Sequence, residues 1–143
     1  MSVSKRESIL VALHAALAAA DAMVTRNAML TDIVDADRFA TLLDGGLAEV
    51  EAFINGSVYE FTATPRLIFG VRRPASGDLD GELAVREAIY VAALEDLGDL
   101  GGLVTDIRPQ PVEYDPRELF GSEDSKAAAL TIEIDYWSAH SVG

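Results

Sequence analysis

Two long stretches of alternating apolar and polar residues constrain the fold of this 143-residue chain more than any other feature. From Val58 onward, one set of alternate positions is apolar: Tyr59, Phe61, Ala63, Leu67, Phe69 and Val71. The positions between them are mainly polar: Glu60, Thr62, Thr64, Arg66 and Arg72. Near the end of the chain, Ala128 to Tyr136 alternates in the same way. Because successive side chains of a strand point to opposite faces, both stretches predict strands with one buried face.

The residues before the first long strand predict a meander. We expect strands from Arg38 to Leu43 and from Leu47 to Ile54, with Asp44-Gly45-Gly46 as the turn between them. Asn55-Gly56 favours a type I′ hairpin into the long strand, because both residues tolerate a positive φ. Pro65 lacks an N–H, so it predicts either an edge position or a bulge in the middle of that strand. Val24 to Arg38 shows no sustained period and is expected to be a short strand or a loop.

Helical patterns lie on either side of the meander. Ser4 and Glu7 have the spacing of a capping box, and apolar residues recur every three or four positions after them, so a helix is expected from Lys5 to about Asp21. A second helix is expected from Glu82 to Leu97, followed by Gly98 as a C-cap. A strand from Val104 to about Arg108 should follow it.

The expected order is therefore α-βββ-α-β-β. This order predicts an α+β fold, in which two helices pack on one face of a mainly antiparallel sheet with a long hairpin. The length favours a single domain over residues 1–143.

Composition narrows the possible functions. Eleven Lys and Arg against 24 Asp and Glu give a formal charge of −13, which repels phosphate and disfavours sequence-reading nucleic-acid binding. The chain has no cysteine, so thiolate chemistry and disulfides are excluded. No apolar run approaches the roughly 20 residues of a membrane span, so no membrane partner is expected.

The sequence offers little that could catalyse a reaction. The two histidines, His14 and His140, share no obvious loop, and His14 is interpreted as a helix-flank residue. Asp78 to Glu82 resembles a calcium loop only faintly and is better explained as acidic residues at a helix start. No phosphate loop, nucleophile elbow or zinc motif is present. We expect no enzyme activity, cofactor or metal, although an enzyme built only on carboxylates stays open.

Six segments follow one another, in order, along nearly the whole chain: ILVALHAALAAA, VTRN, LLDGG, SVYEFTATPRLIFGV, LGDLGGLVTDIRP and KAAALTIEIDYWS. Together they resemble the tail terminator or tail completion proteins of long-tailed phages and gene transfer agents, including prophage members often labelled minor tail proteins. One departure is that the loop after Asn27 carries aspartates where the family would have proline.

The resemblance implies a small α+β protein that forms a six-membered ring on the head-proximal end of a tail tube. Its implied partners are further copies of itself, the tail tube protein and the head–tail connector, and DNA would pass through the lumen without being read. The implied locations are the virion tail and, during assembly, the host cytoplasm. Another head–tail connector, or neck protein, stays open as an alternative.

We expect the contacts of this chain to come from the outer face of the sheet and from its flanking loops. The candidate interaction residues are Arg26, Asn27, Asp32, Asp35, Asp37, Asp44, Glu60, Thr62, Thr64, Arg66, Arg72, Leu119 and Phe120.

Overall fold

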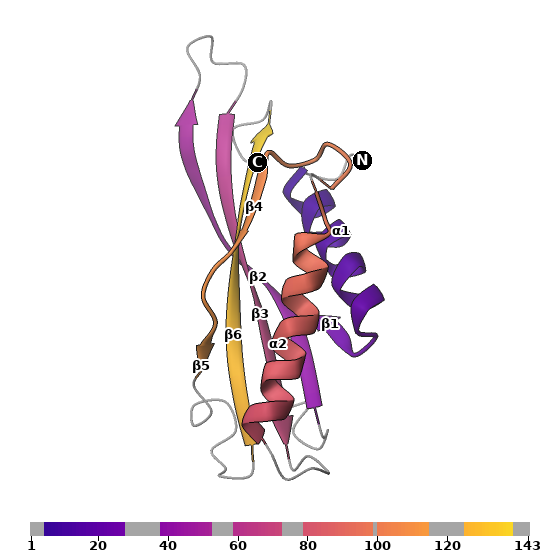
Figure 1. Ribbon diagram of the computed structural model, residues 1–143. Helices are drawn as coiled ribbons and strands as arrows, with labels where there is room; N and C mark the ends of the chain where they lie inside the picture. The colour runs from indigo at the N-terminus through magenta and orange to yellow at the C-terminus, as the bar shows by residue number, and fades with distance from the viewer. Residues whose placement is uncertain are drawn as a thin grey trace.

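The computed structural model describes residues 5–27, 38–52, 59–72, 79–98, 100–114 and 125–138. Over these residues it contains the helices α1 (Lys5–Ala20) and α2 (Leu79–Glu95) and one six-stranded sheet (Figure 1). The strands are β1 (Val24–Arg26), β2 (Arg38–Ala52), β3 (Tyr59–Arg72), β4 (Asp106–Pro109), β5 (Glu113–Tyr114) and β6 (Ser125–Ser138). No helix of the described residues is long and apolar enough to cross a membrane.

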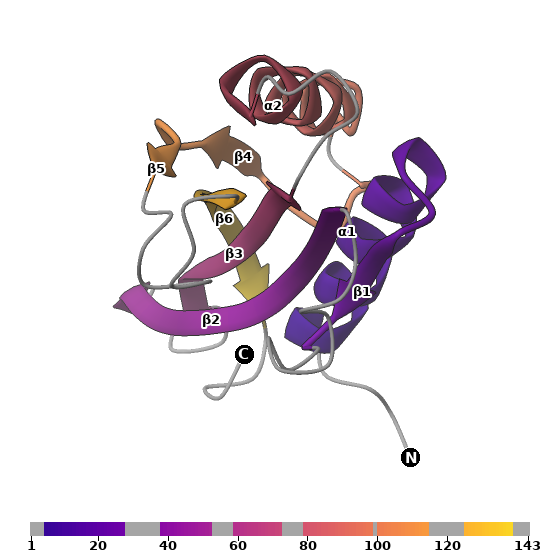
Figure 2. The ribbon, with the colours of Figure 1, turned by 90° about the horizontal axis from the view of Figure 1, so that it is seen from below.

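The three long strands lie side by side in the centre of the sheet. The strand order is β1-β2-β3-β6-β4, and the short β5 also pairs with β6. The pair β1–β2 is parallel, whereas all other pairs are antiparallel. Both helices cover the same side of this curved sheet, as Figure 2 shows. The predicted fold class, α+β with helices on one face of a mainly antiparallel sheet, is confirmed.

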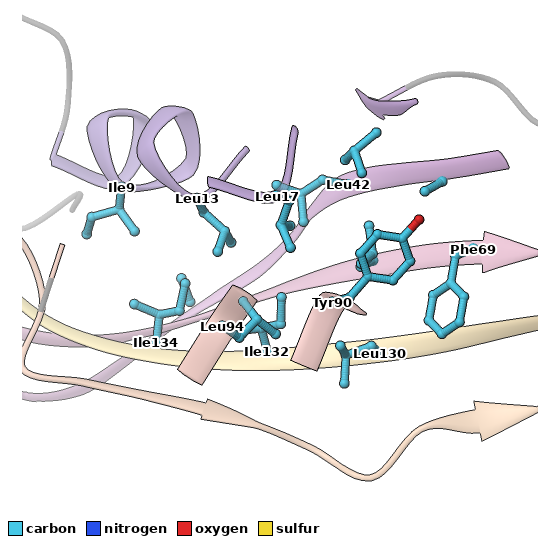
Figure 3. Packing of buried hydrophobic residues seen from close by; sticks show 14 of the residues in the cluster. Ile9, Leu13, Leu17, Leu42, Phe69, Tyr90, Leu94, Leu130, Ile132 and Ile134 are labelled. Carbon is cyan, nitrogen blue, oxygen red and sulfur yellow. The ribbon is translucent and has the colours of Figure 1, made fainter. Parts of the chain in front are cut away.

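The core lies between the helices and the inner face of the sheet (Figure 3). α1 contributes residues at the spacing read from the sequence, and Ile9, Leu13 and Leu17 are completely buried. α2 contributes Tyr90 and Leu94. Opposite them lie the apolar residues of the central strands, including Leu42, Phe69, Leu130, Ile132 and Ile134. The alternation in β3 and β6 therefore exists because one face of each strand is removed from water.

The prediction of a turn at Asp44-Gly45-Gly46 is wrong, because β2 runs through these residues as one strand. The register against β3 shifts there, with Leu43 opposite Arg66 and Gly46 opposite Thr64. The shift is a β-bulge, with Gly45 at φ +69°. Pro65 lies opposite the bulge. Because proline has no N–H, it cannot donate a ladder hydrogen bond, and the bulge interrupts the ladder at that point.

The bulge lies opposite Pro65, but its extra residue belongs to β2, so the bulge expected within the strand of Pro65 is instead in the neighbouring strand. β3 is nevertheless an interior strand there, flanked by β2 and β6. The undecided segment after α1 contains β1, and the strand expected at Val104–Arg108 occurs two residues later as β4. Gly98 has the positive φ of a C-cap, +60°. The capping residue Ser4 and the hairpin turn at Asn55-Gly56 lie outside the described residues.

Candidate interaction surface

The first turn of α1 joins three strands of the sheet. Lys5 Nζ donates to the carbonyl oxygen of Trp137 in β6 at 2.6 Å, and Arg6 donates to that of Gly45 in β2 at 3.0 Å. Glu7 accepts from Arg26 in β1 at 2.9 Å. Three consecutive residues thus reach β6, β2 and β1 in turn. Because β3 lies between β2 and β6, these hydrogen bonds hold the start of α1 over β3.

The predicted residues Arg26, Asn27 and Asp44 come together beside this turn. Arg26 Nε lies 3.1 Å from Asp44 Oδ1, and the Asn27 side-chain oxygen accepts the backbone N–H of Asp44 at 3.1 Å. The hydrogen bonds that Arg26 donates to Glu7 and then to Asp44 raise the pKa of Arg26. Only 22% of the Arg26 side chain is exposed. These three residues therefore hold β1 to the bulge of β2, and little of Arg26 is left for a partner.

A second polar network covers the outer face of the sheet where β3, β6 and β4 adjoin. Arg108 lies 2.6 Å from Asp106, 3.1 Å from Glu133 and 2.6 Å from Asp135. Thr62 donates to Asp135 at 2.7 Å. The bonds to Asp135, Asp106 and Glu133 raise the pKa of Arg108 above its ordinary value. The bond from Arg108, followed by that from Thr62, lowers the pKa of Asp135 against the opposing effect of its burial.

The predicted residues on β3 lie on the face away from the helices. Glu60 and Thr62 are partly buried, and Glu60 is opposite Trp137 of β6. Arg66 is exposed. Trp137 is 45% exposed, which is unusual for a large aromatic side chain and typical of contact surfaces.

This outer face is not uniformly polar. Further along the same face, Phe39, Ile68 and Ala127 form a small buried cluster, with Leu43 packed against it. The upper part of the face, from Thr62 to Trp137, is thus the part that presents polar groups and one exposed aromatic ring.

The remaining predicted residues cannot be placed in a site. Asp32, Asp35, Asp37, Leu119 and Phe120 lie outside the described residues. Arg72 is the last residue of β3, opposite Ser125, but its side chain is not described. Thr64 is partly buried and lies opposite Gly46 at the bulge.

A buried polar cluster joins the two helices. Asp21, at the end of α1, has a side chain only 4% exposed, and it accepts a 2.6 Å hydrogen bond from the Tyr90 hydroxyl of α2. Arg86 lies 3.6 Å from the same carboxylate. His14 Nε2 lies 3.0 Å from the carbonyl oxygen of Val24. In the part of the chain that the structure describes, no three His, Asp or Glu side chains gather as a metal site would require.

Comparison with solved structures places this arrangement among known folds. The chain shares the fold of a sheath/tube terminator. That protein is the PVC sheath/tube terminator of an extracellular contractile injection system, in the extended state; the TM-score is 0.52 and the sequence identity 10%. The match covers 94% of this chain and 58% of the other, so this chain spans less than two thirds of its length. No family model matches the chain, and no curated protein matches it by sequence.

Sequence reasoning missed several members of this surface. Arg108 was read only as the end of a strand, although a basic residue just before Pro109 at a sheet edge would face Glu133 and Asp135 if the strands paired. Glu133 and Asp135 were recognised as the polar face of their strand, but no partner was assigned to them. Trp137 lies beyond the alternating stretch and gave no signal of exposure.

Proposed function

We propose that this chain is a structural tail-assembly protein that caps the head-proximal end of a phage-like tail tube. In this role it forms a ring on the tube, stops elongation and offers a surface for joining to the head. The observation that carries the proposal is the fold shared with a sheath/tube terminator over 94% of the chain. The terminator-like segments of the sequence, which span nearly the same length, support it independently.

Two features of the chain suit such a role: the outer face of its sheet and its net charge. A cyclic ring uses two different patches of each copy, and the outer face of β3 and β6 with its exposed Trp137 can serve as one of them. The formal charge of −13 disfavours adhesion of DNA to a lumen. The proposed partners are therefore other copies of the chain, the tube protein and the head–tail connector. The single domain, the absence of catalysis and the location in the virion tail belong to the same proposal.

Deletion of the gene tests the role directly. If the chain is a terminator, tubes should grow beyond their normal length, and electron micrographs should show overlong tails without heads. Tails of normal length beside filled, unattached heads would instead indicate the alternative function of a neck protein. Tails of normal length joined to heads would contradict both.

A matched pair of variants tests the outer face. Arg66→Ala removes an exposed cation from β3, whereas Ala92→Glu changes the net charge by the same amount at an exposed position of α2. We expect the α2 variant to restore normal tail length in the deletion strain and Arg66→Ala to restore it poorly. Equal complementation would show that the outer face at Arg66 makes no essential contact.

A further inference from the structure

The side of α1 that faces away from the sheet is apolar and carries no charge. Between Glu7 and Asp21 every residue is uncharged, although 24% of the whole chain is charged. Val11 is 52% exposed, and Ala15 and Ala19, which follow it at four-residue intervals, are exposed as well. A surface helix normally presents polar residues to water, and a helix that is apolar all round is normally buried. The solvent side of α1 therefore has the character of a contact surface.

The outer face of the sheet exposes a side chain that needs such a surface. Tyr136 is completely buried in the core, so the next residue, Trp137, points to the outer face, where it is 45% exposed. A large indole ring binds best where the partner surface is apolar and leaves room for it. The valine and alanines of α1 provide both, because the alanine side chains are small and the valine side chain is apolar.

Net charge separates α1 from the other surfaces that could meet this face. The described charges on the outer face around Trp137 sum to −2, from Glu60, Asp106, Glu133 and Asp135 against Arg66 and Arg108. α1 has a net charge of +1, from Lys5 and Arg6 against Glu7. α2 also exposes a valine, but its net charge is −3, from Asp80, Glu82, Glu87 and Glu95 against Arg86. The outer face therefore attracts α1 and repels both α2 and a second outer face.

The two surfaces lie on opposite sides of the molecule. Both helices cover one side of the sheet, and the outer face is the other side, as Figure 2 shows. α1 of one copy can therefore lie on the outer face of the next copy without covering the outer face of its own chain. Two different patches then meet in every contact, which is the condition for copies to follow one another around a ring. A contact between two α1 helices would instead join only two copies and leave Trp137 exposed.

We propose that the solvent side of α1, at Val11, Ala15 and Ala19, binds the outer sheet face around Trp137 of a second copy of this chain. The indole packs on the apolar side of the helix, and the charge of the first turn of α1 favours approach to the acidic face. This inference rests on the proposed function, because it supplies the second patch that the ring requires. The terminator role itself does not depend on this particular contact.

Two variants, each with one blocked surface, test the contact. Ala15→Glu blocks the α1 surface, and Trp137→Ala removes the aromatic ring from the outer face. In analytical ultracentrifugation we expect each variant alone to self-associate at least about tenfold more weakly than the unaltered chain, because the first buries an unpaired carboxylate and the second loses the largest contact side chain. A one-to-one mixture should form a dimer, since one variant keeps the outer face and the other keeps α1.

Ala92→Glu is the matched control. It adds the same charge at an exposed alanine of α2, so it should self-associate as the unaltered chain does. Glutamate is a good helix former, so neither glutamate variant should disturb its helix. Circular dichroism checks that all variants keep the native fold.

Engineered cysteines locate the contact. The chain has no cysteine of its own, so a pair of introduced thiols gives no background. Ala15→Cys combined with Glu60→Cys should give covalent dimers and higher species with a short bis-maleimide. The sheet separates these two positions within one chain, so the link must join two copies. Ala92→Cys combined with Glu60→Cys is the control and should stay monomeric.

Four results would overturn the proposal: an unaltered chain that stays monomeric at its highest soluble concentration, undiminished self-association of Ala15→Glu or of Trp137→Ala, a mixture of these two variants that forms no dimer, or equal cross-linking of both cysteine pairs. Tail length in the deletion strain is a separate measurement. Overlong tails together with any of these results would reject the contact and keep the terminator function. Tails of normal length would reject that function whether or not the copies associate in solution.

Discussion

Replacement of Gly45 by alanine is the sharpest test of the bulge in β2 between Leu43 and Gly46. A Cβ at this position would lie 1.9 Å from the carbonyl oxygen of Thr64 and 3.0 Å from the Cα of Pro65. Both neighbours are backbone atoms of the central strand β3, which cannot rotate away as a side chain can. β2 would have to retreat by about 1.5 Å to restore the 3.4 Å of ordinary contact.

Two costs add at this residue. Alanine at φ +69° is in the left-handed region, which costs about 1–2 kcal/mol. Displacement of packed backbone costs about 1–3 kcal/mol more, by analogy with overpacked cores. We therefore expect Gly45→Ala to lower the free energy of unfolding by about 2–5 kcal/mol, a large share of the stability of a typical domain.

Gly101→Ala is the matched control. Gly101 has nearly the same φ, +70°, but a Cβ there meets nothing within 4 Å. It should cost only the conformational term, about 1–2 kcal/mol. Urea unfolding followed by circular dichroism gives both values, provided that the m-values agree. If the two variants lose equal stability, the close approach of Gly45 to Thr64 is not a real constraint and the bulge has been misassigned.

Three further variants address the core and the polar networks, each measured by urea unfolding. Tyr90→Phe removes the hydroxyl that donates to buried Asp21 and should cost about 1–3 kcal/mol; no loss would mean that water replaces it. Leu13→Ala should cost about 2–5 kcal/mol, and a smaller loss would contradict its complete burial. Arg108→Ala should cost about 1 kcal/mol at neutral pH. The lowered pKa of Asp135 contributes stability above its unfolded pKa that is lost as pH falls through the folded value. In Arg108→Ala the free energy of unfolding should therefore fall less steeply as the pH is lowered. An unchanged pH dependence would contradict the pairing of Arg108 with Asp135.

The parts of the fold that depend on local pattern could be predicted from the sequence. Strict alternation fixed which face of β3 and β6 is buried, because a half-buried strand allows no other arrangement. The recurrence of Ile9, Leu13 and Leu17 identified the buried stripe of α1 for the same reason. The spacing of apolar residues predicts which residues of a helix or strand are buried. This prediction does not require knowledge of the element that packs against them.

The bulge and the networks depend on contacts between distant segments. Asp44-Gly45 is as typical of a turn as of a bulge, and only the position of Pro65 across the strands decides between them. Arg26 and Asp44 are 18 residues apart, and their ion pair exists because β1 pairs in parallel with β2. Arg108 meets Asp135 across 27 residues for a similar reason. A single sequence shows the charges but not the register that joins them.

The first turn of α1 links the sequence pattern to the surface. Its polar residues were expected to begin a helix, and the structure shows that they also close backbone groups of β6 and β2. A buried or edge carbonyl that has a side-chain donor is less available to an incoming strand. The side chains of Lys5, Arg6 and Asn27 therefore close backbone groups of Trp137, Gly45 and Asp44 that an added strand would need, so the same residues that start the helix and follow β1 also protect the sheet from unwanted pairing.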